Sequence, residues 1–343
     1  MKKIESYTAA ASDGLLLNAN ELSVSFSRTI LDELKAAIDE IPFNRYPDAE
    51  ETELLEAYGK CVGFSPAHLL AGNGSDQMLG YLIGTYLGKG KKLFTLEPDF
   101  SMYDYYASTY EADVVKFKEK KDGSYALADF IQAAKDNAPD MILFSNPNNP
   151  GGQCLSPDEV EEILKAFPSI PVVIDEAYIE FSDIPGSEKL IDVYDNLFIT
   201  RTLSKALGAA GLRIGFLIGS QKVMADLKKN FVPYALNRLS MKAAVIALAH
   251  RNEYEPLIAL IKKEREKMYE ESRKFRHLIL YPSEANYLHG RCDNKKLLLK
   301  LFADADIVIR NYNDEDTFRI TIGLPQENER VLQVLQAYEE ACV

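Results

Sequence analysis

The sequence predicts an α/β protein, with a mostly parallel sheet in a large domain and a smaller α+β domain after it. Between Lys92 and Ile218, short apolar runs alternate with stretches of helical spacing, which is the pattern of strands and helices in turn. The apolar runs are continuous, as expected for strands that are buried on both faces of a sheet. After Tyr234 this alternation gives way to two long helical stretches and then to mixed strands and helices. The chain has 343 residues, which is long enough for two domains.

An N-terminal arm and one helix are expected in residues 1–44, packing with the small domain. The arm ends in residues 15–21, where a polar cluster follows an apolar run, and we interpret it as a loop that lies over another part of the protein. Residues 27–41 carry apolar side chains at helical spacing. Arg45-Tyr46-Pro47-Asp48 interrupts that helix, and Asp48 is suited to begin the next one.

The large cofactor-binding domain is expected at residues 45–235 and the small C-terminal domain at residues 236–343. In the first, the predicted strands are 93–96, 114–117, 141–144, 172–174, 197–199 and 214–218, and the predicted helices include 101–110, 127–134 and 157–167. In the second, helices are predicted at 240–250, 253–275 and 326–340, and strands at 278–281, 285–288, 307–309 and 318–322. Ligands of parallel sheets bind beyond the carboxyl ends of the strands, so functional residues are expected there.

Composition and charge exclude several classes of protein. The net charge of −13 argues against a nucleic-acid partner, because phosphate backbones need a basic surface. The apolar runs fall short of the ~20 residues that span a bilayer, and the first residues lack the apolar core of a signal peptide, so no membrane partner is expected. The four cysteines and four histidines show no metal-ligand spacing, which predicts reduced thiols, a cytoplasmic location and no metal site.

Lys205 is the leading candidate for chemistry. It follows the apolar run 197–199, lies between Ser204 and small residues, and precedes Arg213. An amine in such a turn is suited to form a Schiff base with a carbonyl cofactor, and Arg213 is suited to hold that cofactor's phosphate. A lone Ser-Lys pair is more typical of a solvated surface lysine, so this interpretation depends on residues elsewhere in the chain.

Asp175 lies at the carboxyl end of the predicted strand 172–174, where a buried carboxylate is costly unless a cation pairs with it. One interpretation is a magnesium ligand in a nucleotide-hydrolysing protein, but the chain lacks the GxxxxGK[ST] loop that such proteins need. The other is a partner that keeps the ring nitrogen of pyridoxal phosphate protonated. Tyr178 could then reach the ring hydroxyl of the same cofactor.

Three further features are weak evidence when taken singly. The glycine-rich run 72–76 opens a helix and could bind an anion, although taken alone it is more typical of a simple capped helix start. Asn149 follows another apolar strand and could donate to the cofactor's phenolic oxygen, or belong to a plain Asn-Pro turn. Tyr103 offers a ring for stacking on a planar cofactor or for packing in the core.

In combination and in this order, these motifs resemble those of class I/II aminotransferases of fold type I, over essentially the whole chain. The motifs are Gly74-Ser75-Asp76, Asn149-Pro150-Gly151-Gly152, Asp175-Glu176-Ala177-Tyr178, Ser204-Lys205 and Arg213. Residues 17–21, 45–48 and 318–323 narrow the resemblance to the histidinol-phosphate aminotransferase branch. The ordered combination is specific, although each piece is weak.

The resemblance implies a homodimeric enzyme that uses pyridoxal phosphate to move an amino group from a histidinol-phosphate-like donor to a 2-oxo acid such as 2-oxoglutarate. Lys205 resembles the Schiff-base lysine and proton shuttle, and Asp175 the partner of the pyridinium nitrogen. Tyr46 resembles a tyrosine that crosses the dimer interface to the neighbour's cofactor phosphate, so that the two active sites are shared. The other residues that the resemblance assigns are Asn149 and Tyr178 on the ring hydroxyl, Tyr103 stacked on the ring, Asn20 and Arg319 near the substrate, and Gly74, Ser75, Asp76, Thr202, Ser204 and Arg213 around the phosphate.

Two departures from the family pattern concern the substrate more than the cofactor. Gly151 stands where the family usually has threonine, so that this turn is expected to be looser, and the arm lacks the proline that usually follows Asn-Glu-Asn. Other amino donors, aromatic ones among them, therefore stay open, as does a threonine-phosphate decarboxylase, because fold and cofactor do not fix which bond breaks. A regulator built on the same fold is disfavoured, because the chain has no basic DNA-binding segment.

Overall fold

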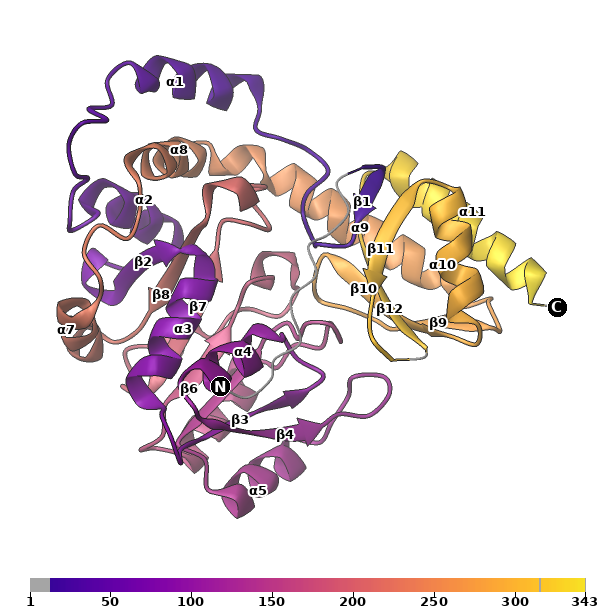
Figure 1. The fold of residues 1–343 in the computed structure, drawn as a ribbon, viewed down its shortest axis with the longest axis horizontal. Coiled ribbons are helices and arrows are strands. Elements are labelled where there is room, and N and C mark those ends of the chain that lie inside the picture. Colours follow the sequence, from indigo (N-terminus) through magenta and orange to yellow (C-terminus); the bar gives the residue numbers. More distant parts are fainter. Residues whose placement is uncertain (1–12, 315, 343) are drawn as a thin grey trace.

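A computed structural model describes residues 13–314 and 316–342, and in them the chain forms two sheets that lie side by side (Figure 1). The larger sheet has the order β2-β8-β7-β6-β5-β3-β4. Its strands are β2 (Leu69–Asn73), β3 (Lys92–Glu97), β4 (Asp113–Lys118), β5 (Met141–Ser145), β6 (Val172–Asp175), β7 (Leu197–Thr202) and β8 (Ile214–Ile218). Neighbouring strands from β4 to β7 are parallel, so the carboxyl ends of β3, β5, β6 and β7 share one edge.

Helices cover both faces of the larger sheet, as the continuous apolar strands require. They are α2 (Thr52–Val62), α3 (Gly74–Tyr86), α4 (Met102–Thr109), α5 (Leu127–Asn137), α6 (Pro157–Ala166) and α7 (Gln221–Asn230). One face of the central strands packs on α3, α4 and α7, and the other packs on α2, α5 and α6. Alternate residues of a strand point to opposite faces, so Leu143 joins the first core and Phe144 the second.

The smaller sheet has the order β1-β11-β12-β10-β9. Its strands are β1 (Leu15–Leu17), β9 (Leu278–Leu280), β10 (Tyr287–Cys292), β11 (Ile307–Asn311) and β12 (Thr317–Thr321), and the helices beside it are α10 (Lys295–Asp304) and α11 (Pro325–Ala341). β1 is parallel to β11, and the remaining neighbours are antiparallel. The N-terminal arm thus belongs to the small sheet before the chain crosses to the large one.

Two long helices connect these parts. They are α8 (Arg238–Ala249), which packs on α2 and on α1 (Arg28–Ile38), and α9 (Glu255–Ser272), which runs toward the small sheet (Figure 1). In α9 the Arg265 guanidinium donates to the carbonyls of Phe181 and Ala285 at 3.0 Å each. It thus links the segment after β6 of the large sheet to the segment before β10 of the small sheet. Short 3₁₀ turns complete the chain at Pro66–His68, Ile179–Phe181, Glu188–Leu190, Ala210–Leu212 and Arg251–Glu253.

The mostly parallel α/β fold predicted from the sequence is confirmed, and four details go beyond or differ from the prediction. Residues 15–17, expected in a loop, form the edge strand β1, because β11 offers them a parallel partner. β2 was not expected, and β8 is antiparallel to both of its neighbours, β2 and β7. Strand β10 begins and ends later than the predicted strand 285–288. In the described ranges no helix has the length and apolarity needed to cross a membrane.

Candidate active site

Asp175 occupies the middle of the edge where the parallel strands end. It is the last residue of β6, is only 4% exposed, and receives two hydrogen bonds of 2.9 Å, from Tyr103 Oη and Thr200 Oγ1. Burial raises the pKa of its carboxyl to about 6, although both hydrogen bonds oppose this shift. The carboxylate is therefore held charged near neutral pH, and a cationic group beside it would be stabilised.

Lys205 lies in the turn that follows β7 and reaches back over the edge. Its Nζ donates to the carbonyl of Ala19 in the N-terminal arm at 2.8 Å, and lies 5.9 Å from the centre of the Tyr178 ring. Burial and the positive charge of Arg319 together lower the pKa of this amine to about 8, although Glu21 and Asp76 oppose the shift. A substantial share of the amine is thus unprotonated and nucleophilic at mildly alkaline pH.

The arm lies directly on the site through Asn20. Its side-chain amide donates to Tyr178 Oη at 3.0 Å, and its backbone N–H donates to Thr321 Oγ1 at 3.0 Å. Asn20 has φ of 55°, a left-handed conformation that asparagine tolerates better than most residues. Burial raises the pKa of Tyr178 to about 12, so this phenol stays protonated. The predicted substrate residue Asn20 and the predicted cofactor residue Tyr178 are therefore in direct contact.

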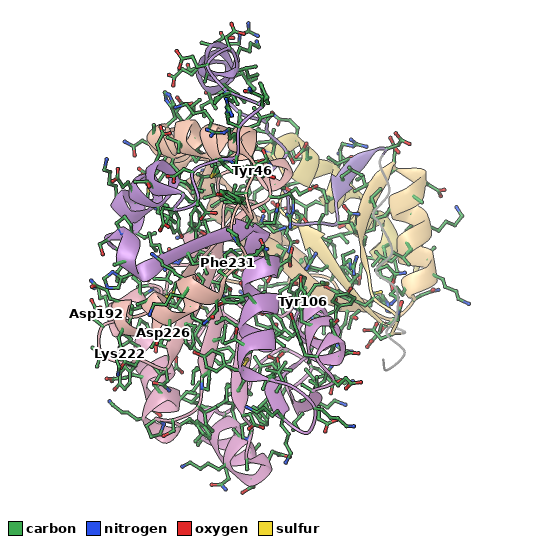
Figure 2. The ribbon with its side chains drawn as sticks, turned by 60° about the vertical axis from the view of Figure 1, so that its left-hand side comes forward. Tyr46, Tyr106, Asp192, Lys222, Asp226 and Phe231 are labelled. Atoms are coloured by element: carbon green, nitrogen blue, oxygen red, sulfur yellow. The ribbon has the colours of Figure 1, made fainter. Side chains whose placement is uncertain are left out.

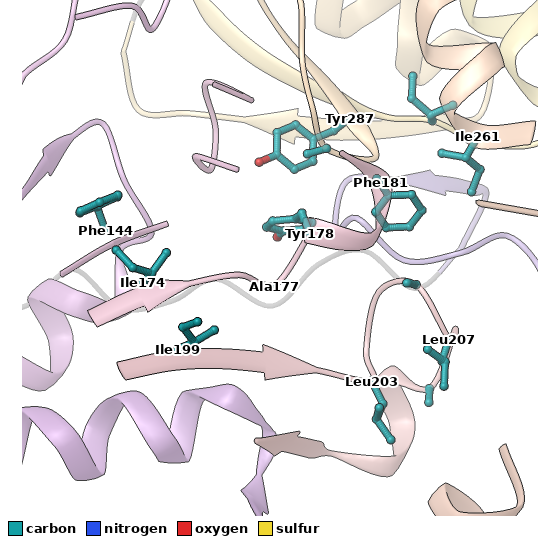
Figure 3. Close-up of a cluster of buried hydrophobic side chains, with 14 of the residues drawn as sticks. Phe144, Ile174, Ala177, Tyr178, Phe181, Ile199, Leu203, Leu207, Ile261 and Tyr287 are labelled. Atoms are coloured by element: carbon teal, nitrogen blue, oxygen red, sulfur yellow. The ribbon is translucent and has the colours of Figure 1, made fainter. Parts of the chain in front are cut away.

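Asn149 and Arg319 meet from opposite sides of the site. An Arg319 Nη1 hydrogen bond to Asn149 Oδ1 joins β12 to the loop after β5, and Arg319 Nη2 donates to Asn18 O at 3.0 Å. Arg319 also lies over the ring of Tyr287 at 5.0 Å, and Tyr287 makes an edge contact with Tyr178 (Figure 3). Within the described chain, the buried Nε of Arg319 has no hydrogen-bond partner.

Polar residues at the start of α3, which we call the anion cup, have the chemistry that suits an anion. Gly74 N donates to Arg213 O at 2.9 Å, and a Cβ added at Gly74, whose φ is +76°, would lie 2.6 Å from Arg213 Nη2. Arg213 is oriented by an ion pair with Asp76 at 2.8 Å. Thr202 and Ser204 share a 2.9 Å hydrogen bond, and Thr202 Oγ1 also donates to Ile214 O, beside Arg213.

The structure brings these sequence-predicted residues to one edge: Asn20, Gly74, Ser75, Asp76, Tyr103, Asn149, Asp175, Tyr178, Thr202, Ser204, Lys205, Arg213 and Arg319. Tyr46 is 78% exposed (Figure 2), and its ring stacks on that of Tyr234, at 4.9 Å between ring centres. Tyr103 uses its hydroxyl to donate to Asp175 and is itself 1% exposed.

Sequence reasoning missed several residues that complete the site. Thr200 is the cross-strand neighbour of Asp175, and Tyr287 donates to the carbonyl of Asn148 at 2.6 Å. A signal for Thr200 existed, because it alternates with Thr202 along β7 and so shares its face. The contacts of the arm carried no such signal, because they depend on how distant elements pack.

The Asn148–Gly152 turn is closed although Gly151 lacks the expected hydroxyl. Gly151 N donates to Asn148 Oδ1 at 2.7 Å, and Gly152 N donates to Asn148 O at 2.7 Å. A Cβ at Gly151 would lie 2.8 Å from Asn148 Oδ1, so a larger residue here would displace the Asn148 side chain. The Asn148 side chain thus stabilises, through its hydrogen bond with Gly151 N, the turn that contains Asn149.

These groups offer complementary chemistry. They are a cation, two hydroxyls and a helix N-terminus, together with a nucleophilic amine and a buried carboxylate. Such a set fits a flat molecule with a phosphate, a carbonyl and a basic ring nitrogen.

The chain matches the family of aminotransferases of class I and II over residues 12–335. It is 34% identical to a histidinol-phosphate aminotransferase from Chlorobaculum tepidum, over 93% of this chain and 93% of that protein. The solved structure of the histidinol-phosphate aminotransferase from Clostridium acetobutylicum is similar with a TM-score of 0.86 and 25% identity, over 95% of this chain and 99% of that one. The histidinol-phosphate aminotransferase from Sinorhizobium meliloti, solved in complex with pyridoxal 5'-phosphate, has a TM-score of 0.87 at 22% identity, over 96% of this chain and 92% of that one.

Proposed function

This chain belongs to the class I and II aminotransferases, and we propose that it transfers the amino group of histidinol phosphate to a 2-oxo acid such as 2-oxoglutarate, as in histidine biosynthesis. Pyridoxal 5'-phosphate is the cofactor. The observation that carries the proposal is the buried Lys205 amine, held by the Ala19 carbonyl and with a lowered pKa, in a site that also holds the buried Asp175 carboxylate and the Arg213–Asp76 pair. Relatives that are 31 to 34% identical over most of the chain carry the name of this activity.

The residues present can hold every polar part of the cofactor. Lys205 would bond its carbonyl carbon, and Asp175 would pair with its ring nitrogen. When bound, the cofactor supplies a ring that accepts the electron pair from the substrate bond being broken. The remaining contacts are assigned to Asn149 and Tyr178 at the ring hydroxyl, Tyr103 beside the ring, and Gly74, Ser75, Asp76, Thr202, Ser204 and Arg213 at the phosphate.

Lys205 has a second task as the proton carrier. With the cofactor and substrate bound, the Nζ of Lys205 would take the proton from the substrate's Cα. A pKa of about 8 suits this exchange, because the amine can both accept and release a proton near neutral pH. The arm carbonyl of Ala19, which accepts from Nζ at 2.8 Å, keeps the amine close to the edge of the sheet.

Arg319 is the proposed contact for the anionic end of the substrate. Its cross-strand partners, His289 and Arg310, are not acidic, so they do not neutralise its charge. Arg310, the cross-strand partner of Arg319 on β11, adds positive charge where a phosphate would bind, although the whole chain carries a net charge of −13. Asn20, which contacts Tyr178 and Thr321, would close the site above the substrate.

We propose that the enzyme is a homodimer in which Tyr46 completes the partner's phosphate site. Two exposed aromatic side chains beside Tyr46 support the dimer. Phe43, which lies close to Tyr46 in the sequence, is 67% exposed, and Tyr234, which stacks on Tyr46, is 47% exposed. Arg238 donates to the carbonyls of Arg45 and Tyr46 and so fixes this segment on the surface. The proposal also places the enzyme in the cytoplasm, where its cysteines, which are free thiols, would stay reduced.

A panel of amino donors tests the substrate assignment. The purified enzyme, loaded with pyridoxal phosphate and 2-oxoglutarate, is given histidinol phosphate, phenylalanine, leucine or threonine phosphate, and glutamate is quantified. We expect the highest kcat/KM with histidinol phosphate. A preference for phenylalanine or leucine would leave the assignment as an aminotransferase intact but would contradict histidinol phosphate as the substrate. Release of carbon dioxide from threonine phosphate would show that the enzyme is a decarboxylase.

A further inference from the structure

Three consecutive residues of the N-terminal arm are each held by a different part of the site. The carbonyl of Asn18 accepts from Arg319, and that of Ala19 accepts from Lys205. Asn20 is held more extensively than either, because its backbone N–H, its carbonyl and both polar atoms of its side chain make hydrogen bonds. The mechanism above gives no role to the residues that hold Asn20 in this way.

Thr321, the last residue of β12, makes two of these bonds. Its Oγ1 accepts from Asn20 N at 3.0 Å and donates to Asn20 Oδ1 at 3.1 Å. A third bond comes from the Asn286 side-chain amide, which donates to Asn20 O at 3.1 Å. Thr321 and Asn286 are both 0% exposed, and Asn20 is 1% exposed. Together the three bonds hold Asn20 at its left-handed φ of 55°.

The bond from Thr321 also decides which way the Asn20 amide points. A hydroxyl carries one hydrogen, and Thr321 donates it to Asn20 Oδ1, so Oδ1 stays on the side of Thr321. Asn20 Nδ2 is then the atom that faces Tyr178, and it donates to Tyr178 Oη at 3.0 Å. Because Tyr178 Oη is the acceptor in this bond, its own hydrogen remains available for a second acceptor.

We propose that Thr321 is a positioning residue for Tyr178: by orienting the Asn20 amide, it leaves the Tyr178 hydroxyl hydrogen to be donated to the ring hydroxyl oxygen of the cofactor. The proposal rests on the proposed function, which assigns Tyr178 to that oxygen. Thr321 is buried and uses its hydroxyl on Asn20, so it acts through Asn20.

The reversed amide would have the opposite effect on Tyr178. With Oδ1 of Asn20 toward the phenol, the tyrosine hydrogen would be drawn to the arm and lost to the cofactor. The phenol itself is a donor at neutral pH, because burial raises the pKa of Tyr178 to about 12, although Arg319 and the bond from Asn20 oppose the rise. The orientation of the amide therefore decides where this donor points.

Cofactor affinity tests the proposal without reference to any substrate. The Kd of the apoenzyme is measured for pyridoxal phosphate and for 3-deoxypyridoxal phosphate, which lacks the ring hydroxyl. The Kd of the analogue divided by that of pyridoxal phosphate reports the contacts of the ring hydroxyl. We expect Tyr178→Phe to reduce this ratio about tenfold, within the usual range for one hydrogen bond, and Thr321→Val to reduce it about three- to tenfold.

A double-mutant cycle separates positioning from packing. The Tyr178→Phe protein has no hydroxyl left to orient, so adding Thr321→Val to it should not lower the ratio further. Thr321→Ser keeps the hydroxyl and should keep the wild-type ratio. Thr317→Val is the matched control on the same strand, because Thr317 is 4% exposed and its hydroxyl donates to Asp314, and its ratio should match wild type.

Asn20→Asp tests the same chain of contacts if Thr321→Val folds poorly. Aspartate tolerates the left-handed conformation and can still accept from Thr321, but it places an acceptor where the amide donates to Tyr178. We expect its ratio to fall at least as far as that of Thr321→Val.

An unchanged ratio in Thr321→Val or Asn20→Asp, or equal weakening of both ligands, would overturn the positioning role while leaving the cofactor assignment intact. A further reduction on adding Thr321→Val to Tyr178→Phe would do the same. If the wild-type enzyme bound both ligands equally, the assignment of Tyr178 to the ring hydroxyl would fail and this proposal with it. If it bound neither, the proposed function itself would fail.

Discussion

Burial decides the chemistry of Lys205 before any cofactor binds. Its amine has an ordinary pKa of 10.5, and desolvation together with Arg319 brings it to about 8. A lysine whose pKa falls on folding costs stability while it is protonated in the native state. That cost is greatest below pH 8 and disappears as the pH rises through the unfolded value of about 10.4. The lowered pKa of Lys205 thus reduces the free energy of unfolding and makes the amine more reactive.

The rate at which the apoenzyme attaches pyridoxal phosphate should therefore rise with pH about a midpoint near 8. Only the unprotonated amine attacks a carbonyl, and its fraction grows as the pH passes the pKa of Lys205. Stopped-flow absorbance between pH 6 and pH 10 measures this rate, with a lysine peptide as the reference. A midpoint near the peptide's own value would show that the pocket does not lower this pKa.

The sequence predicted the residue types of the site better than their contacts. Lys205, Asp175 and Arg213 follow apolar strands or glycine-rich turns, and those local patterns indicated the edge where they lie. The hydrogen bond from Asn20 to Tyr178 could not be predicted in this way, since it joins residues 158 positions apart. Packing of the arm against the finished site decides it.

Strand pairing explains which elements were predictable. The parallel strands β3, β5, β6 and β7 are continuous apolar runs, and each was recognised from its own residues. β1 has only Leu15–Leu17, and its pairing with Ile307–Ile309 is visible only once the chain has folded. β2 ends at the glycine-rich run, whose turn signal hid the strand before it.

Strand pairing places Arg319 on β12 opposite His289 on β10, and a substitution of Arg319 tests its proposed role in substrate binding. Arg319→Lys should raise the KM for histidinol phosphate by about 10- to 100-fold, because an ammonium cannot make the two-pronged contact of a guanidinium with an anion. Steady-state kinetics measure the change.

Arg291→Lys is the matched control for that substitution. Arg291 lies two residues from His289 on β10 and already pairs with Asp316 at 2.6 Å. Its replacement should leave KM close to the wild-type value. Equal effects of the two substitutions would assign Arg319 a general electrostatic role.

At the scale of the whole molecule, the site exists only because two sheets are held together. β12 supplies Arg319, β10 supplies Tyr287, and the arm crosses above both, while the large sheet supplies Asp175 and Lys205. α9 fixes the two halves through Arg265. The division into domains at residues 45–235 and 236–343 stays a prediction, as does the dimer.

Mixing two impaired variants tests the shared site of the proposed dimer. Tyr46→Phe would weaken the proposed phosphate contact from one subunit to its partner, and Lys205→Ala removes the amine from its own subunit. A heterodimer of the two holds one site with both changes and one site with neither, so activity should exceed that of either parent. Native mass spectrometry verifies subunit exchange, and its presence without recovered activity would argue against a shared site.

The central claim is that Lys205 holds the cofactor covalently, and peptide mapping after borohydride reduction tests it most directly. Borohydride makes the bond between the lysine and the cofactor permanent, so that mass spectrometry of the digested protein locates it. The account predicts that the pyridoxyl group is found on Lys205 and is absent from the Lys205→Ala variant. A pyridoxyl group on a different lysine of the wild-type protein would contradict it.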